Sequence, residues 1–466
     1  MSSRVKTSTQ SLAPDHLLGR LNDHLPIPGR YWVAFSGGLD SSVLLNLLVA
    51  VREKLLAPLS VIHVDHRLQP QSAAWAQHCH SECRRLGVPL ISIKVDAAHR
   101  PGESPEAAAR IARYAALADT IGADGMLLTA HHRDDQAETL LLQLLRGAGV
   151  EGLAAMPMVR EWSGGWHARP LLEWSRSAIH EWAVTHQLRW VDDPSNAGTA
   201  ADRNYLRHQV MPALVARWPG AAQNLVRSAA HCADAAAMIR HQAALDLDHA
   251  SRTAPGRLPV ARLRDLPEAR ARNLLRLWLR GLGAAPLPAA RLDEALSQLS
   301  SARADAQVCI AWHGMTLRRY REEVWLVPED VCAPPEIPFD WDGEAIEPGP
   351  GLGLVRRRLA LGGIDQQRWA RGRVQLGFRH AGLRCRPVGR IGSRSFKALA
   401  QECGIPPWLR DCVPLLLIDG ELAGIANCCT CEPFAAPPGE SGWVIEWLSE
   451  SSATDWSPSP PGRGVR

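Results

Sequence analysis

The feature that most constrains this fold is a short apolar run followed directly by a glycine pair and a leucine-rich segment. Residues 31–35 are typical of a buried strand, residues 36–41 read Ser-Gly-Gly-Leu-Asp-Ser, and residues 43–48 are typical of a helix. Such a unit directs free backbone N–H groups and the positive end of a helix dipole toward one point. The two glycines let the backbone approach an anion without interference from Cβ atoms. The sequence therefore predicts an anion site within an α/β fold.

The turn differs from a Walker A loop because Asp40 and two serines are present and the terminal lysine is missing. A carboxylate beside a polyphosphate is tolerated mainly when Mg²⁺ bridges the two groups. We therefore predict a loop that binds ATP and the pyrophosphate released during adenylation, with Mg²⁺ at Asp40. The residues that would line the phosphate site are Ser36, Gly37, Gly38, Leu39, Asp40 and Ser41, and the family resemblance given below implies that they hold the phosphates of ATP. The alternative is a glycine-containing corner whose serines only cap a helix.

The first half of the chain alternates between strand and helix patterns, as a doubly wound, mainly parallel sheet requires. Further strands are predicted over 59–64, 89–95 and 125–130, and helices over 75–86 and 105–121. Ser36, Asp65 and His131 each follow a strand. Because ligands of such sheets bind beyond the carboxyl ends of the strands, we expect the site at this edge.

A second polar cluster follows the last of these strands. Asp135 and Glu138 are three residues apart and project from one face of the helix predicted after them. Two such carboxylates near ATP can hold Mg²⁺, or bind a cationic amine and accept its proton. The alternative is an acidic first turn in which Asp134 or Asp135 caps the helix. Joint metal ligation by His131 and His132 is disfavoured because adjacent helical side chains point apart.

Composition limits how far the basic residues can be interpreted. Of 52 lysines and arginines only four are lysines, so a single arginine is weak evidence for a site in this chain. Arg110 and Arg113 share a helix face and could approach a phosphate, or could belong to a solvated basic face. The net charge of +4 is too small to indicate a nucleic-acid partner by itself.

The cysteines and the N-terminal residues indicate the cellular compartment in which the protein is expected. Eleven scattered cysteines in a chain of 466 residues do not suggest a disulfide framework. The polar start lacks the order of a signal peptide, and no apolar run is long enough to span a bilayer. We expect a cytoplasmic protein with no membrane partner. Cys428, Cys429 and Cys431 are expected to be buried small residues, because no second cysteine pair lies near enough in sequence for an ordinary zinc site.

The second half has a different pattern. Residues 219–299 are rich in alanine, arginine and leucine at helical spacing, and strands are predicted over 308–312 and 323–327. A stretch rich in proline, glycine and acid over 334–353 is expected to be a connector. Residues 371–410 carry nine basic residues and one acid, which suits a phosphate backbone, although an arginine-inflated surface is the alternative.

Several runs together resemble one family. The loop at 36–41 resembles the PP-loop of the N-type ATP pyrophosphatases, which adenylate a carbonyl or carboxyl group before a nucleophile displaces AMP. The more specific resemblance is to the tRNA(Ile)-lysidine synthetases. It rests on further motifs, in the expected order, over residues 106–114, 129–139, 146–149, 190–196, 203–207 and 406–415.

The resemblance implies a two-step ligase reaction on a tRNA(Ile) that has a CAU anticodon. ATP adenylates the C2 oxygen of the wobble cytidine, and the ε-amine of free L-lysine then attacks C2 and expels AMP. The implied catalytic residues are Asp40, Arg113, Asp135 and Arg203. Asp135 and Glu138 would bind the lysine amine, with Asp135 as the base. The implied tRNA contacts are Arg207, Arg384, Arg386, Arg390, Lys397 and Arg410.

The expected architecture is an α/β PP-loop domain with a doubly wound, mainly parallel sheet, then a helical domain and a small α+β C-terminal domain. The expected boundaries are an N-terminal extension over 1–28, the catalytic domain over 29–215, the helical tRNA-contacting domain over 216–330, a connector over 331–370, the basic C-terminal domain over 371–448 and a disordered tail over 449–466. A homodimer is one option for the assembly, which the sequence does not determine.

Two rival functions share some of these features. A PP-loop tRNA thiolase would use the same adenylation but needs sulfur chemistry, for which Cys79 and Cys83 are the nearest cysteines in sequence. A non-enzymatic RNA-binding scaffold would not need Asp40, Asp135 and Glu138. The ligase consumes lysine, whereas the thiolase consumes a sulfur donor. A scaffold would show no RNA-dependent release of pyrophosphate.

Overall fold

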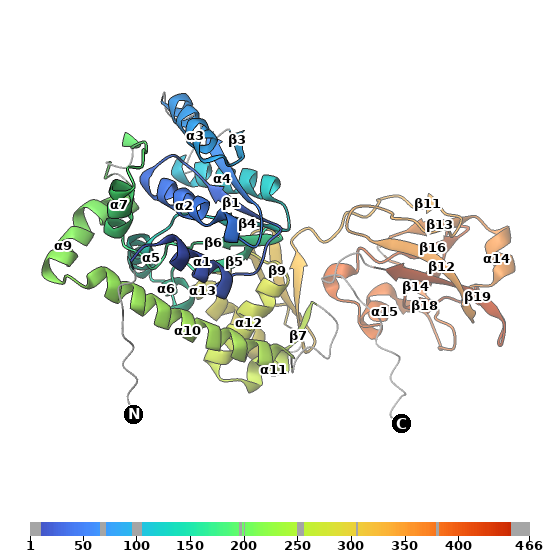
Figure 1. Ribbon diagram of the computed structural model, residues 1–466. Helices are drawn as coiled ribbons and strands as arrows, with labels where there is room; N and C mark the ends of the chain where they lie inside the picture. Colours follow the sequence, from blue (N-terminus) through green and yellow to red (C-terminus); the bar gives the residue numbers. More distant parts are fainter. Residues whose placement is uncertain are drawn as a thin grey trace. The chain divides into compact units, whose positions relative to one another are not determined.

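The computed structural model describes residues 11–65, 71–95, 105–194, 198–199, 201–248, 256–303, 306–378 and 382–448, and side chains within these except those of 105–109. The predicted tail over 449–466 lies outside the described residues, as do Ser195 and Asn196 of one family motif. The chain divides into two compact units, residues 1–238 and 239–466, which are described separately. Figure 1 shows the helices and strands of both units.

The first unit contains a six-stranded sheet in the order β3-β2-β1-β4-β6-β5, in which all neighbours are parallel except β5 and β6. The order reverses between β1 and β4, which is the arrangement of a doubly wound sheet and confirms the predicted fold class. The strands are β1 (Arg30–Ala34), β2 (Leu59–Asp65), β3 (Leu90–Lys94), β4 (Gly125–Leu128), β5 (Val159–Trp162) and β6 (Gly165–Ala168).

Helices connect the strands and cover both faces of this sheet. They are α1 (Pro14–His24), α2 (Leu39–Ala50), α3 (Ser72–Leu86), α4 (Pro105–Ile121), α5 (Arg133–Leu145), α6 (Val150–Leu153), α7 (Arg176–Thr185), α8 (Asp202–Tyr205) and α9 (Met211–Arg217), with short 3₁₀ and π segments at Arg52–Lys54 and Leu206–Val210. Helix α10 (Ala221–Asp248) continues into the second unit.

Alternating residues of β1 explain why the sheet is covered on both sides. Val33 is fully buried in a core built with α1, α2 and α7, whereas its neighbour Trp32 packs in a second core with Leu117 and Ile121 of α4. Successive strand side chains point to opposite faces, so a strand such as β1, with apolar residues at four consecutive positions from Tyr31 to Ala34, needs a layer on each side. The carboxyl ends of β1 and β4 are left at one edge, where the chain forms the site.

The second unit begins with helices packed on an antiparallel sheet of order β7-β10-β9-β8. Its core contains Leu274, Trp278, Leu296 and Val324. Strands β8 and β10 confirm the two predicted strands, and β7 and β9 were not predicted. The elements are β7 (Arg257–Pro259), α11 (Val260–Asp265), α12 (Glu268–Gly281), α13 (Ala289–Ser301), β8 (Cys309–Trp312), β9 (Met315–Tyr320) and β10 (Glu323–Pro328).

The C-terminal part has a separate core around a five-stranded antiparallel sheet of order β11-β13-β16-β17-β18. The pairs β12–β19 and β14–β15 form two smaller sheets. The elements are β11 (Phe339–Asp340), β12 (Leu354–Leu361), α14 (Gln366–Arg371), β13 (Val374–Gly377), β14 (Arg384–Cys385), β15 (Arg394–Ser395), α15 (Phe396–Glu402), a 3₁₀ turn (Pro407–Leu409), β16 (Leu415–Ile418), β17 (Glu421–Ile425), β18 (Cys429–Thr430) and β19 (Ser441–Leu448). Among the described helices, none is both long and apolar enough to cross a membrane.

The cysteines correct one expectation. Disulfides join Cys332 to Cys412, Cys385 to Cys431 and Cys403 to Cys428, all within the C-terminal part. The expectation of no disulfide framework is therefore wrong, as is the expectation that Cys428 and Cys431 are simply buried small residues, whereas Cys429 is unpaired. The partners lie 80, 46 and 25 residues apart, so the tertiary fold brings them together and local spacing gives no sign of it.

Candidate active site

The glycine turn lies where the sequence places it, between the end of β1 and the start of α2. Gly37 has a φ of +81°, and a Cβ atom at this position would lie 3.1 Å from both Cys79 Sγ and Val191 Cγ2. Any side chain would therefore be strained there. The Gly37 carbonyl accepts a 2.9 Å hydrogen bond from the Val191 N–H. Part of the family motif at 190–196 thus packs against the predicted ATP loop.

The serines of the turn make local hydrogen bonds. Ser41 Oγ donates to the Gly38 carbonyl over 3.0 Å and lies 3.2 Å from Ser36 Oγ. Gly38 is the N-cap residue of α2 and contributes no side chain to the cap. The first N–H groups of this twelve-residue helix have no partners within the helix, so they can donate to an anion.

Asp40 has the environment expected of a metal ligand. Its Oδ1 atom is buried and has no hydrogen-bond partner among the described residues, although 34% of the side chain is exposed. Burial raises the pKa of Asp40 above its usual range, and the nearby His132 acts in the opposite direction. A buried carboxylate oxygen without a donor is rare and calls for a cation or water. The residues present therefore fit Mg²⁺ between Asp40 and a bound phosphate.

Asp135 and Glu138 form a compact charge cluster with two arginines. Glu138 is 2% exposed and accepts hydrogen bonds from Arg203 Nε over 2.9 Å and Arg207 Nε over 2.7 Å. Asp135 Oδ1 accepts from Arg203 Nη2 and Arg207 Nη2, each over 3.0 Å. The arginines follow the carboxylates by 65 to 72 residues, so only the fold reveals this pairing. The structure thus brings together four of the residues that the sequence selected.

Helix α5 is capped differently from the prediction that Asp134 or Asp135 is the cap, because its N-cap residue is His132 and Asp135 takes part from the third helical position. Asp135 Oδ2 accepts the His132 N–H over 2.9 Å, and His132 Nδ1 accepts the Asp135 N–H over 3.3 Å, which together form a capping box. Burial disfavours the charged form of Asp135, but His132 and Arg203 hold the pKa of this carboxyl below its usual range. The carboxylate is therefore ionised and suited to bind a cation.

His132 also belongs to the candidate site, although it was not among the site residues predicted from the sequence. Its Nε2 lies 3.7 Å from Asp40 Oδ2 and 3.4 Å from Asp135 Oδ2, so it links the predicted nucleotide and amine sites. Because Nδ1 accepts a backbone N–H, a neutral His132 carries its proton on Nε2, facing both carboxylates. The available signal was its position in the turn between β4, which ends at Leu128, and α5, which begins at Arg133.

His131 points elsewhere, which agrees with the expectation against joint metal binding by the two histidines. Its Nδ1 lies 2.8 Å from Thr129 Oγ1, which in turn lies 2.9 Å from Nε2 of the buried His167. Burial and then the charge of Arg169 lower the pKa of His167 to about 2. Burial also lowers the pKa of His131 to about 3, against the opposing effect of Asp135. Both rings are neutral at physiological pH.

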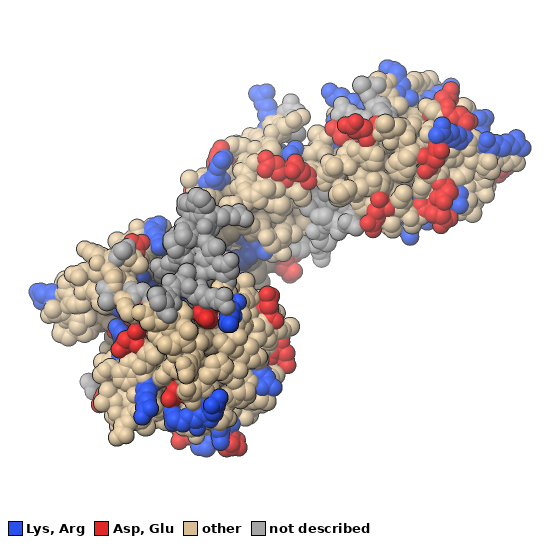
Figure 2. All heavy atoms as spheres, turned by 90° about the horizontal axis from the view of Figure 1, so that it is seen from above, with Lys and Arg blue, Asp and Glu red and all other residues tan. Residues whose placement is uncertain are grey.

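The remaining predicted site residues lie on α4 and in the C-terminal part. Arg113 is exposed on α4, and its participation stays a prediction. Arg384, Arg386, Arg390 and Lys397 are exposed in the C-terminal part, and Arg410 is half-buried. Several of these side chains already have partners: Arg386 lies 3.0 Å from Glu432, and Arg390 pairs with Glu402. Figure 2 shows basic and acidic side chains interspersed on the C-terminal part, at the right of the view.

Three family models match the chain in order. A PP-loop domain matches residues 16–214, a TilS substrate binding domain matches 258–325, and a TilS substrate C-terminal domain matches 374–447. Among solved structures, a U34-tRNA thiolase from Methanococcus maripaludis covers 46% of this chain and 77% of its own at 16% identity. Its TM-score of 0.40 is too low to bear on the activity.

Curated proteins named tRNA(Ile)-lysidine synthase are similar over nearly the whole chain. That of Methylococcus capsulatus is 42% identical over 90% of this chain and 96% of its own length. Those of Alkalilimnicola ehrlichii and Pseudomonas aeruginosa are 43% and 40% identical, over 92% and 90% of this chain and 96% and 93% of their own. This chain belongs to the tRNA(Ile)-lysidine synthase family.

Proposed function

We propose that the protein is a ligase that joins the ε-amine of lysine to C2 of the wobble cytidine of a CAU-anticodon tRNA(Ile). In the first step the C2 oxygen attacks the α-phosphorus of ATP and pyrophosphate leaves. In the second step the lysine amine attacks C2, the C–O bond breaks and AMP leaves with its oxygen. The products are lysidine in the tRNA, AMP and pyrophosphate.

One observation carries the link to chemistry. His132 lies within 3.7 Å of Asp40 at the predicted phosphate loop and within 3.4 Å of Asp135 in the acidic pair. This closeness supports the proposal, because adenylation followed by attack of an amine requires the proposed nucleotide site and the proposed cation site to adjoin. A scaffold that binds RNA without chemistry gives no reason for a buried carboxylate oxygen that has no donor.

The match to a PP-loop domain supports the use of ATP. We propose in addition that Mg²⁺ binds together with the ATP. Asp40 would hold the ion together with the phosphates, and Ser36, Gly38 and Ser41 would line the phosphate side. When bound, the ion would offset the negative charge that develops on the departing pyrophosphate.

Asp135 and Glu138 would hold the lysine ammonium, which has a pKa of about 10.4 when free and is no nucleophile until it loses a proton. The lowered pKa of Asp135 favours binding of the cation first. Proton transfer to Asp135 would then accompany attack, when the adenylated C2 draws on the nitrogen lone pair. Arg203 would face the reacting groups, as would Arg113, and Arg207 would contact the tRNA.

Purified protein incubated with ATP, Mg²⁺, labelled lysine and a CAU-anticodon transcript tests the proposal. We expect label in the tRNA together with release of AMP and pyrophosphate. A transcript changed only at the wobble base is the matched control and should stay unlabelled. Incorporation of sulfur without use of lysine would identify a thiolase, and binding of tRNA without release of pyrophosphate would identify a scaffold. Because ATP and tRNA are cytoplasmic substrates, the proposal includes a cytoplasmic location.

A further inference from the structure

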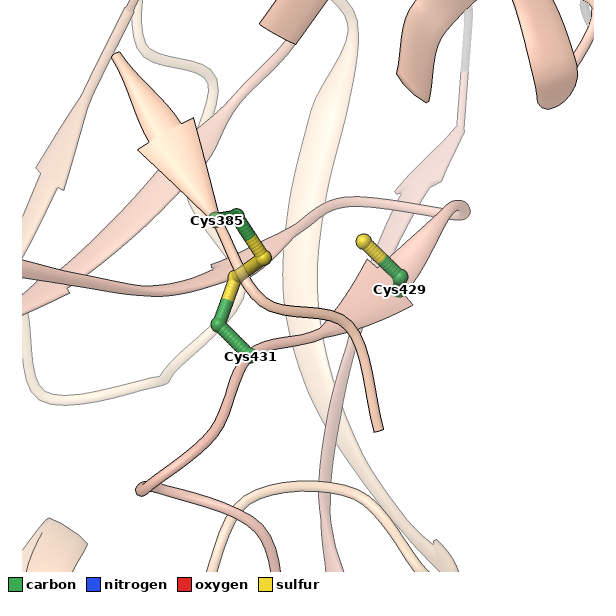
Figure 3. A group of neighbouring side chains, drawn as sticks. All are labelled: Cys385, Cys429 and Cys431. Carbon is green, nitrogen blue, oxygen red and sulfur yellow. A yellow bond between two sulfur atoms is a disulfide. The ribbon is translucent and has the colours of Figure 1, made fainter. Parts of the chain in front are cut away.

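Three cysteines of the C-terminal part meet at one point that the proposed reaction does not use. The sulfur atoms of Cys385, Cys429 and Cys431 all lie within 4.8 Å of one another. Figure 3 shows Cys385 and Cys431 joined as a disulfide and the sulfur of Cys429 turned toward them. Cys429 is unpaired and partly exposed, whereas the other two are buried.

Backbone pairing holds these cysteines together independently of the disulfide. Cys429 and Cys431 are two residues apart on an extended segment, so their side chains lie on the same side. The segment that follows Cys385 lies beside them, because the Val388 N–H donates to the Thr430 carbonyl over 3.2 Å. The Glu432 N–H donates to the Arg386 carbonyl over 2.7 Å. The three thiols would therefore stay near one another after reduction.

We propose that the reduced form of Cys385, Cys429 and Cys431 binds one soft divalent metal ion, of which Zn²⁺ is the expected one. Zinc–sulfur bonds of about 2.3 Å in a tetrahedral site place the sulfurs about 3.8 Å apart. After reduction the Cys385 and Cys431 sulfurs must separate from bonding distance to this spacing, and Cys429 Sγ already lies within 4.8 Å of both. Three thiolates leave the fourth position of the tetrahedron to a water molecule or another side chain.

The chemical balance of site formation is simple. A dithiol reductant first converts the Cys385–Cys431 disulfide into two thiols and is itself oxidised to a disulfide. Zn²⁺ then displaces one proton from each of the three thiols, giving a complex with a net charge of −1. This step rests on the proposed function, which implies a cytoplasmic location. The cytoplasm is a reducing compartment in which disulfides are rare.

The surroundings favour a metal over a simple disulfide. A disulfide needs two sulfurs, and the third one here has no role in it. The Cys332–Cys412 and Cys403–Cys428 pairs have no such third partner among the described residues, where this is the only group of three candidate ligands. The hairpin around β14 and β15 carries four arginines: Arg384, Arg386, Arg390 and Arg394. Among the described residues two carboxylates pair with them, Glu432 with Arg386 and Glu402 with both Arg390 and Arg394. Excess positive charge stabilises an anionic thiolate complex.

Zinc binding by the full chain tests this proposal. The protein is reduced, stripped with a chelator under anaerobic conditions and titrated with ZnCl₂ against a chromophoric chelator, and Co²⁺ absorption reports thiolate ligation. We expect one zinc ion per chain. Cys429→Ser should weaken zinc binding by more than the roughly 10–100-fold that loss of an outer-shell partner costs. Cys309→Ser, at an exposed unpaired cysteine on β8, is the matched control and should bind as the wild type does.

Folding is checked separately, since Cys429 is in no disulfide and its serine variant should melt like the metal-free wild type. A reduced wild-type protein that binds no zinc, or zinc binding unchanged by Cys429→Ser, would overturn the proposal. The lysine-transfer assay is independent of this titration, so failure of the metal site and failure of the proposed ligase activity give different results.

Discussion

Replacement of Asp135 by asparagine should separate the two steps of the proposed reaction. Asparagine keeps an oxygen that can accept the His132 N–H, so the cap of α5 should persist. It removes the negative charge that Arg203 and Arg207 contact at 3.0 Å and that the lysine ammonium would use. ATP binding, which depends on the loop around Asp40, should change little.

The expected size follows from the interaction lost. A charge-assisted hydrogen bond contributes about 1.5–3 kcal/mol. Since about 1.4 kcal/mol corresponds to a factor of ten, the KM for lysine should rise roughly 10- to 100-fold. The cost to folding stability should be smaller, about 1–2 kcal/mol, because Arg203 and Arg207 remain 28% and 21% exposed and can be hydrated.

The assay measures lysine transfer against lysine concentration, with release of pyrophosphate followed in parallel. Adenylated tRNA should accumulate at low lysine, because the first step does not need the amine. Glu181→Gln on α7 removes an exposed carboxylate and serves as the matched control. An unchanged KM for lysine together with an unchanged transfer rate would reduce Asp135 to a helix cap.

Three further predictions concern other parts of the chain. Asp40→Asn should nearly abolish RNA-dependent release of pyrophosphate while tRNA binding, measured by filter retention, stays intact; undiminished release would refute the role of the loop. His167, whose pKa is lowered from 6.5 to about 2 by burial, contributes stability that is fully present above pH 6.5 and is lost as the pH falls below it. His167 alone accounts for a loss of about 2 kcal/mol between pH 7 and pH 5, so urea unfolding of His167→Gln should lose about that much less stability than the wild type over this range. Arg386→Ala with Lys397→Ala should lower the salt slope of tRNA binding by about 0.7–0.9 per lost phosphate contact, and Arg52→Ala should not; an unchanged slope would assign these residues to an ordinary basic surface.

The sheet and its site edge could be predicted because local patterns encode them. The helix predicted over 105–121 has those bounds in the structure, and the strand predicted over 59–64 is one residue longer. The apolar runs, the glycine turn and the polar residues after each strand are all contiguous in sequence. Strands β5 and β6 were missed because neither contains an apolar run: β5 reads Val-Arg-Glu-Trp and β6 reads Gly-Trp-His-Ala, whereas the equally short β4 carries Met126, Leu127 and Leu128.

What the sequence could not predict depends on contacts between distant residues. The pairing of Glu138 with Arg203 and Arg207 spans 65 and 69 residues, and in a chain with this many arginines nothing local distinguishes these two. The disulfides, and the approach of Cys385 to Cys429, have the same cause. Tertiary structure decides such contacts, and residue spacing along the chain does not.

The two sequence interpretations of Asp135, helix cap and cation ligand, turn out to be compatible. Oδ2 accepts the His132 N–H at 2.9 Å, whereas Oδ1 faces Arg203 and Arg207 at 3.0 Å. The cap fixes the rotation of the carboxylate, so the direction of Oδ1, which now faces the two guanidinium groups, is set before any ligand binds. A carboxylate whose orientation is fixed in advance loses less entropy when it binds an ammonium group. The helix cap therefore strengthens the functional interpretation, because it positions the oxygen that the proposed lysine site needs.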